Sequence, residues 1–407
     1  MLFFWLIVVA AALLIYVVLD GYDLGIGVLT LFQRDAADRR RMVEVVGNVW
    51  DGNESWLVLL AMGLWGGMPD AYATALPALY LPLLTMIFAL VFRGFAVEMT
   101  LRRPLSDRVW TRLFGVGSLV AAFAQGVLLG GLLCGVTVRH ELFAGRPLDF
   151  LGHGYALLTG LVTVSLYSLA GAARLQAKTD GELRNRTAAL VRPLTLTTVA
   201  AVTVAAALLP AATSARLSLD GVGHRLPFGC AVLVAAAGFW TVYRRAGRAP
   251  DGIPFAGVAA AEAAGLVALL ALFYPQIVPP SVTLSSSAAP AETIGFLVVA
   301  IVAIIPVTVA YQIYANWVFR GRQPLEVDAT PGDLGAAGST PRRADDRGWP
   351  RSLRLLLTAA LVPVCGAAIL AAENDFAFIG GWFDPLLIGL MLATVTAAWA
   401  TTARSQR

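Results

Sequence analysis

The sequence predicts an all-α fold, that of a polytopic integral membrane protein. Of the 407 residues, 58% are hydrophobic and only 14% are charged, which is more apolar surface than a soluble domain of this length buries. Apolar runs long enough to cross a bilayer, about 20 residues each, recur along the chain. Lysine and arginine gather in alternate connections between these runs. Together these observations exclude a soluble domain and predict a set of membrane-crossing helices.

Nine apolar segments form the predicted core of the protein. We expect membrane spans at 2–31, 54–67, 74–97, 112–138, 151–173, 190–212, 226–245, 254–274 and 291–319. The segment Met1–Val18 has no basic n-region and no small-residue cleavage site before Asp20, so we expect a retained first span rather than a signal peptide. The second span is short, and its boundary with the third lies within the stretch GGMPDAYA at 66–73.

The chain is expected to continue beyond this core. We predict a nine-span core at 1–322, a flexible cytoplasmic linker at 323–350 and an extra C-terminal hydrophobic hairpin at 351–407. The linker is rich in Pro, Gly, Asp and Thr and has too few apolar residues to pack. The hairpin holds two weaker apolar stretches, 355–372 and 386–402, so the chain would cross the membrane eleven times.

The basic residues predict the orientation of the chain. Loops after odd-numbered spans are rich in arginine, and loops after even-numbered spans are poor in it. The first group includes Arg34, Arg39, Arg40, Arg41, Arg102, Arg103, Arg108, Arg174, Lys178, Arg184, Arg186, Arg244, Arg245 and Arg248. By the positive-inside rule these loops are cytoplasmic, the N-terminus is outside and the C-terminus is cytoplasmic.

Charged residues are predicted to gather where the first three spans meet the cytoplasm. They are Asp20, Asp23, Asp51, Glu54, Arg93 and Glu98. The i, i+3 spacing places Asp20 and Asp23 on one side of their helix, and Asp51 and Glu54 on one side of theirs. One interpretation makes Asp51 a helix N-cap with Glu54 as its capping-box partner. The other makes the group a protonatable site, because acids within spans are costly.

Three further features of the spans bear on packing and binding. Gly21 and Gly25 form a small-xxx-small step that would let a neighbouring helix approach closely. Glu262 is an intramembrane acid of the eighth span whose role stays open. The ninth span ends in polar and aromatic residues, which we expect to be interfacial anchors, with a bound structural quinone or lipid as the alternative. They are Tyr311, Gln312, Tyr314, Asn316 and Trp317.

The residues that bind metals and cofactors are scarce and scattered. The histidines and cysteines are His140, His153, His224, Cys134, Cys230 and Cys365. The histidines are predicted in or beside outer loops, and the cysteines lack the paired spacing of a disulfide framework or a metal site. Because a membrane haem needs axial His or Met ligands within the spans, we expect this chain to bind no haem and no metal. We expect no nucleic-acid partner.

Several motifs resemble subunit II of the cytochrome bd-type quinol oxidases. They are DGYDLGIG at 20–27, WDGNESWLV at 50–58, RGFAVEM at 93–99, QGVLLGGLLCGV at 125–136 and LAGAARLQAKTDGEL at 169–183. Their order, spacing and predicted topology match the family over about residues 1–322. The glutamine-glycine form of the fourth motif resembles the cyanide-insensitive branch more closely. The tail beyond the ninth span departs from the family pattern.

The resemblance implies a fold of two four-helix bundles plus a ninth helix, and a bacterial cytoplasmic membrane protein. It implies a heterodimer in which subunit I binds the haems and oxidises quinol from the membrane pool, while this chain binds no cofactor. A small accessory membrane subunit is also compatible with it. Dioxygen is reduced to water with protons from the cytoplasm, on a path to which the aspartate of WDGN belongs.

The family pattern carries over to this chain residue by residue. It assigns Asp51 to the proton path, and Asp23 also matches its family position. Asp20 and Glu54 join the path by location alone. Supporting roles are expected for Trp50, Asn53, Arg93, Glu98 and Glu262.

Two rival functions remain open from the sequence. A proton-coupled secondary transporter also has many spans and intramembrane acids, but it predicts broken helices that meet at the bilayer midplane. A purely structural subunit would use the acids as helix caps and interhelical contacts. Co-purification with a haem-bearing subunit separates the oxidase from the transporter.

Overall fold

The computed structural model describes residues 1–102, 108–139, 142–146, 148–151, 154–214, 217, 222–248 and 252–318. Its helices are α1 Leu2–Thr30, α2 Ala36–Gly47, α3 Trp50–Gly67, α4 Pro69–Ala78, α5 Tyr80–Arg102, α6 Arg108–Cys134, α7 Tyr155–Lys178, α8 Gly181–Ala212, α9 Val222–Arg245, α10 Ile253–Phe273 and α11 Ala291–Val318. Two strand pairs lie between helices, β1 Val138–Arg139 with β2 Leu142–Phe143 and β3 Gln276–Val278 with β4 Val282–Thr283. A short 3-10 turn covers Asp149–Leu151.

The predicted all-α membrane class is confirmed. Within the described ranges, seven helices are long and apolar enough to cross a membrane, namely α1, α5, α6, α7, α8, α9 and α10. The apolar segment Ala291–Ile301 of α11 is shorter. The contacts divide the chain into two compact units, one that holds residues 4–290 and one that includes α11. The arrangement as two four-helix bundles stays a prediction.

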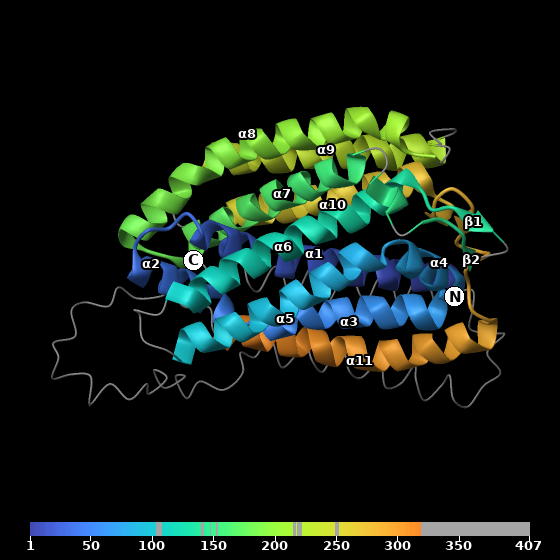
Figure 1. Ribbon diagram of the computed structural model, residues 1–407, viewed down its shortest axis with the longest axis horizontal. Helices are drawn as coiled ribbons and strands as arrows, with labels where there is room; N and C mark the ends of the chain where they lie inside the picture. The colour runs from blue at the N-terminus through green and yellow to red at the C-terminus, as the bar shows by residue number, and fades with distance from the viewer. Residues whose placement is uncertain are drawn as a thin grey trace. The chain divides into compact units, whose positions relative to one another are not determined.

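Neighbouring helices of the unit that holds residues 4–290, here called the first unit, pack in chain order. Helix α5 packs against α6, α6 against α7, α7 against α8, and α9 lies along α10 (Figure 1). Helix α1 crosses α7 at very short range, as its glycine step predicts. A Cβ atom on Gly25 would lie 1.7 Å from the Tyr167 carbonyl oxygen, so only glycine fits at this crossing.

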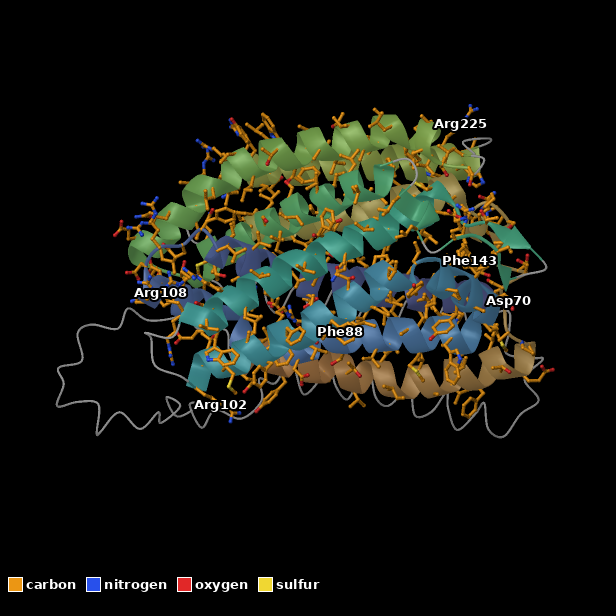
Figure 2. All side chains as sticks on the ribbon, viewed as in Figure 1. Asp70, Phe88, Arg102, Arg108, Phe143 and Arg225 are labelled. Carbon is orange, nitrogen blue, oxygen red and sulfur yellow. The ribbon has the colours of Figure 1, made fainter. Side chains whose placement is uncertain are left out.

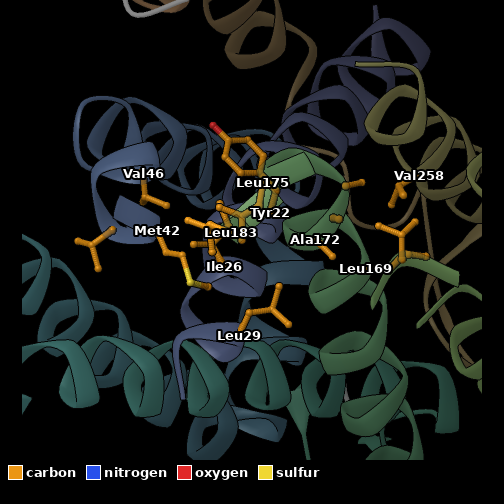
Figure 3. Packing of buried hydrophobic residues seen from close by; sticks show 14 of the residues in the cluster. Tyr22, Ile26, Leu29, Met42, Val46, Leu169, Ala172, Leu175, Leu183 and Val258 are labelled. Carbon is orange, nitrogen blue, oxygen red and sulfur yellow. The ribbon is translucent and has the colours of Figure 1, made fainter. Parts of the chain in front are cut away.

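Helix α2 is a short amphipathic helix that closes one end of the core. Its N-cap is Asp35, whose Oδ1 accepts a hydrogen bond from the Asp38 amide at 2.8 Å. Met42 and Val46 from its apolar side belong to a buried cluster with Ile26 of α1 and other residues of α7, α8 and α10 (Figure 3). Burying this face fixes α2 beside the ends of α1 and α7.

The second and third predicted spans begin at the wrong residues. Helix α3 starts at Trp50 rather than at 54, and it ends at Gly67. Pro69 then opens α4, because proline is tolerated in a first helical turn but disfavours helical geometry at the residue before it, Met68. Residues 74–78 therefore belong to α4, and the third long helix begins only at Tyr80.

The two ends of the helices in the first unit differ in their side chains. Arg102 and Arg108 lie at one end, whereas Asp70, Phe143 and Arg225 lie at the other (Figure 2). The first end also receives the C-terminus of α1 and the start of α3, so it is the end where the predicted charged residues gather. The predicted linker at 323–350 and hairpin at 351–407 lie outside the described residues.

Candidate functional site

Arg93 of α5 joins acids from two other helices. Its side chain is fully buried, and its Nη1 donates a hydrogen bond to Oδ1 of Asp20 on α1 at 2.8 Å. Its Nη2 donates to Oε1 of Glu54 on α3. The Asp20 side chain is 1% exposed and the Glu54 side chain 25% exposed, so the ion pairs run from the interior toward the surface. The Trp50 ring lies 6.0 Å from the guanidinium carbon of Arg93.

A second polar contact links α1 to α3 beside this arginine. Nδ2 of Asn53 donates to Oδ2 of Asp23 at 2.8 Å and to the Tyr22 hydroxyl at 3.2 Å. Asn53 and Asp23 are both fully buried. We call Asp20, Asp23, Asn53, Glu54 and Arg93 the acid cluster.

The antiparallel packing of α1 on α3 brings these residues together. Near the opposite end of the two helices, Nε1 of Trp5 donates to the Gly63 carbonyl oxygen at 3.1 Å. The same register then places Asn53 against Asp23. The i, i+3 spacing turns Asp20 and Asp23 to one side of α1, as the sequence predicts. The cluster is therefore a consequence of how α1, α3 and α5 pack.

Several polar atoms of the acid cluster can still form hydrogen bonds. Among the described groups, Oδ2 of Asp20, Oδ1 of Asp23, Oδ1 of Asn53 and Nε of Arg93 have no hydrogen-bond partner and are buried. Two carboxyl groups, those of Asp20 and Glu54, pair with Arg93, and that of Asp23 is held by Asn53. Like charges at short range oppose full ionisation of such a set. The arrangement can hold, accept and release protons.

Asp51 lies at the surface beside the acid cluster. It is exposed, in the first turn of α3. The N-cap of α3 is Val49, with no side-chain cap, so the interpretation of Asp51 and Glu54 as a capping box is wrong. The backbone of Val49 and Trp50 already starts the helix before Asp51. A cap therefore does not account for either acid.

Two predicted supporting residues lie away from the acid cluster. Glu98 is 40% exposed and pairs with Arg102 at 3.0 Å, as an i, i+4 surface pair. Glu262 of α10 is 8% exposed, and its Oε1 has no hydrogen-bond partner among the described groups. Neither side chain contacts Arg93 through a described hydrogen bond.

Sequence reasoning missed an arginine that approaches the acid cluster from α7. The Arg174 guanidinium carbon lies 4.9 Å from the centre of the Tyr22 ring and 5.3 Å from that of Phe255. Arg174 was counted only as a loop charge for the orientation. Its place in the fifth motif, inside an apolar helix, was the available signal. Its contact with Tyr22 connects it to Asn53 and so to Asp23.

Helix α2 links the outer end of the site to neighbouring helices. Arg40 donates to the carbonyl oxygens of Thr100 at 3.2 Å and Leu101 at 3.0 Å. Asp38 pairs with Arg186 of α8 at 3.7 Å. Burial, followed by the nearby Asp35 carboxylate, raises the pKa of Asp38, while Arg41 and Arg186 lower it. These contacts hold α2 across the ends of α5 and α8.

Potential metal ligands do not cluster in this structure. Within the described ranges, no group of three or more His, Cys, Asp or Glu side chains is arranged to hold a metal ion. His224, the one described histidine, has its Nδ1 2.9 Å from the Ala271 carbonyl oxygen. His140 and His153 lie outside the described residues.

Curated relatives share this sequence over different lengths. The chain is 32% identical over 205 residues to cytochrome bd-I ubiquinol oxidase subunit 2 of Escherichia coli K12, which covers 48% of this chain and 54% of that protein. The chain thus spans about half the length of this relative. It is 24% identical over 330 residues to cytochrome bd ubiquinol oxidase subunit 2 of Bacillus subtilis 168, covering 78% of this chain and 95% of that one.

A solved structure shares the fold of this chain, and a family model identifies its family. The structure resembles a chain of the bd oxidase from Geobacillus thermodenitrificans with a TM-score of 0.64 at 16% identity, over 78% of this chain and 96% of that one. That likeness shows the fold. The family model for cytochrome bd terminal oxidase subunit II matches residues 1–319, which is most of the sequence. The chain belongs to the cytochrome bd terminal oxidase subunit II family.

Proposed function

We propose that this chain is the haem-free subunit II of a quinol:dioxygen oxidoreductase and that it conducts protons toward the oxygen-reducing site. Its partner is a haem-bearing subunit I, as the subunit names of its relatives imply. The haems of that partner supply the oxygen-reducing chemistry. The observation that carries the proposal is the acid cluster, in which a fully buried arginine pairs with Asp20 and Glu54 while Asp23 is held by Asn53.

The proposed path begins at the exposed end of α3 and leads inward. Asp51 takes a proton from water, and Glu54, three residues on and on the same side of the helix, is its nearest neighbour on the path. Glu54 contacts Arg93, which in turn contacts Asp20. Because Arg93 contacts both carboxyl groups, a proton that reaches one of them weakens its ion pair and strengthens the other. The exposed fraction falls along this order, from Asp51 through Glu54 to Asp20.

The basic residues favour a cytoplasmic location for this end of the molecule. Arg102 and Arg108 lie there (Figure 2), and the positive-inside rule places such residues in the cytoplasm. We therefore propose that the N-terminus is outside and that protons enter from the cytoplasm. Protons consumed from one side only would charge the membrane.

A proton-coupled transporter is less well supported. That class builds its site from broken helices near the bilayer midplane. Here Asp20 and Asp23 lie in the last three turns of the continuous helix α1, toward one end of the packed helices. The family match over residues 1–319 also favours the oxidase subunit.

The test uses the complex purified from its native membrane. We expect a haem-bearing subunit to co-purify and to give the visible spectrum of a haem protein, whereas a lone colourless chain would contradict the oxidase assignment. Asp20→Asn, Asp23→Asn and Glu54→Gln should assemble with normal haem content and lose most of their quinol oxidase turnover. Asp35→Asn on α2 is the matched control, because Asn caps a helix about as well as Asp. Full turnover in all three assembled variants would remove the proton path.

A further inference from the structure

A partly buried chain of hydrogen bonds lies beside the acid cluster and has no part in the path described above. Gln125 of α6 lies between two tyrosines. Its Nε2 donates to the hydroxyl of Tyr16 on α1 at 2.7 Å, and its Oε1 accepts from the hydroxyl of Tyr167 on α7 at 2.8 Å. Tyr16 is 3% exposed and Tyr167 is 2% exposed. Three helices therefore meet at one amide group.

The direction of these hydrogen bonds determines where the Tyr16 proton goes. Since Tyr167 donates to Oε1 of Gln125, the amide presents its NH₂ group to Tyr16. The Tyr16 oxygen accepts that bond, which leaves its own hydroxyl proton available for another acceptor. In the reverse amide orientation Tyr16 would donate to Gln125 instead, and no other acceptor would receive its proton.

The acceptor in reach is Asp20. It lies four residues after Tyr16, one turn along the same side of α1, and the two side chains interact. Arg93 already occupies Oδ1 of Asp20, whereas the buried Oδ2 has no hydrogen-bond partner among the described groups. A hydroxyl donor directed at Oδ2 would satisfy this atom.

Close packing fixes Tyr167, which lies at the far end of this chain of hydrogen bonds. A Cβ atom on Gly21 would lie 2.7 Å from Cε1 of Tyr167, so the ring of Tyr167 is seated directly against α1. This ring cannot shift toward α1, and its hydroxyl stays directed at Gln125. The crossing of α1 and α7 thus holds the Tyr167 hydroxyl beside the Gln125 amide.

We propose that Gln125 is a positioning residue, which orients Tyr16 so that the Tyr16 hydroxyl donates a hydrogen bond to Oδ2 of Asp20. The inference rests on the proposed function, because it assigns Asp20 to the proton path. Gln125 then acts on the acid cluster from α6, a helix that contributes no charged residue to it. A hydrogen bond to the ionised carboxylate favours proton release from Asp20 to the next group on the path.

The titratable and charged groups that face Asp20 come from α1, α3, α5 and α7. They are Tyr16 and Asp23 of α1, Glu54 of α3, Arg93 of α5 and Tyr167 of α7. Tyr16→Phe and Gln125→Leu leave all the charged members of this set in place. A change in the pH dependence of these variants therefore reports the hydrogen bond rather than an altered charge.

The experiment measures quinol oxidase turnover against pH in the purified complex. Without the Tyr16 hydroxyl, Asp20 keeps its proton to higher pH, so we expect the rising limb of the profile to move up by about one pH unit in Tyr16→Phe. Gln125→Leu should move it in the same direction, because Tyr16 is no longer held. Tyr155→Phe is the matched control, since it also removes a buried tyrosine hydroxyl. This hydroxyl belongs to α7 and donates to the Ala205 carbonyl oxygen at 3.2 Å.

Infrared difference spectra provide a second readout that does not depend on turnover. The carboxyl stretching band that disappears in Asp20→Asn identifies Asp20, and this band should shift in Tyr16→Phe and Gln125→Leu but not in Tyr155→Phe. An unshifted band and an unshifted profile in assembled Tyr16→Phe would overturn the inference. If the band and the pH profile shift in Tyr16→Phe but stay as in the native complex in Gln125→Leu, the role of Gln125 is overturned.

Failure of this inference is separable from failure of the proposed function. If Asp20→Asn keeps full turnover, the proton path through Asp20 is wrong. The proposed function then fails, whatever the pH profile of Tyr16→Phe. If Asp20→Asn loses turnover while Tyr16→Phe and Gln125→Leu behave as the native complex does, the path stands and the positioning role is wrong.

Discussion

At the scale of single residues, Arg93 is the centre of the site. It is fully buried and contacts two acids that belong to different helices. Breaking a buried ion pair by removing one partner leaves an uncompensated charge and is much more harmful than replacing both partners together. The first prediction follows from this asymmetry.

Arg93→Met should be strongly destabilising, by about 3–5 kcal/mol, because Asp20 and Glu54 lose their partner. Thermal unfolding of the purified complex, followed by haem absorbance, measures this loss. Adding Asp20→Asn and Glu54→Gln to Arg93→Met should recover much of the stability but not the turnover. A triple variant as unstable as Arg93→Met would show that the arginine acts through packing rather than through charge.

Asp51 and Asp35 provide a matched pair of exposed acids. Asp35 caps α2, whereas Asp51 lies inside the first turn of α3 and caps nothing. Asp35→Ala should therefore cost about 1 kcal/mol of stability with turnover unchanged. Asp51→Ala and Asp51→Asn should both keep their stability and lose turnover equally. Impaired assembly in Asp51→Ala alone would restore the capping interpretation.

The site shows which residues can be predicted from the sequence. Acids inside apolar spans are visible there, so Asp20, Asp23, Glu54 and their partner Arg93 could be named together. Tyr16, Gln125 and Tyr167 could not, because each is an ordinary residue of an apolar helix until its partner on another helix is known. Glu98 pairs with Arg102 on its own helix, and its supporting role stays a prediction.

At the scale of helices, the crossing of α1 and α7 determines the geometry of the site. A Cβ atom on Gly25 would lie 1.7 Å from a backbone oxygen, which cannot move aside as a side chain can. Gly25→Ala should push the two helices apart and sharply reduce the yield of haem-containing complex. Gly265→Ala on α10 is the control, because nothing lies within 4 Å of its added Cβ. Equal yields from both variants would contradict the tight crossing.

Apolar length predicts the helices of this chain well and their ends poorly. The spans 254–274 and 291–319 match α10 and α11 within a residue. The end of the second span at residue 67 was predicted, whereas the short helix α4 after it was missed, and residues 74–78 were assigned to the third span. The start of α3 was placed too late, since Trp50 and Val49 carry no capping side chain.

At the scale of the whole molecule, orientation in the membrane is the property that the path depends on. The exposed Ser286 lies in the 275–290 segment, and Arg34 precedes α2 near the other end of α1. In whole cells, an impermeant thiol reagent should label Ser286→Cys from outside and should fail to label Arg34→Cys until the membrane is broken. The reverse pattern would move the entrance of the proposed path to the outside.

The C-terminal extension is predicted to be separable from the family core. The family model ends at residue 319, and the predicted linker at 323–350 is poor in apolar residues. A chain truncated after Arg322 should assemble with subunit I, bind haem normally and keep its turnover. Loss of haem or of subunit I from the truncated complex would show that the predicted hairpin at 351–407 is an integral part.

The pairing of Arg93 with acids from two other helices limits how sequences of this family can diverge. A mutation that removes Arg93, Asp20 or Glu54 alone passes through an intermediate with an unbalanced buried charge, which is costly. These three positions are therefore expected to change together in evolution, although they are separated in the sequence. Lineages that lack the arginine are expected to lack both acids as well, and an alignment of homologues would reveal this covariation.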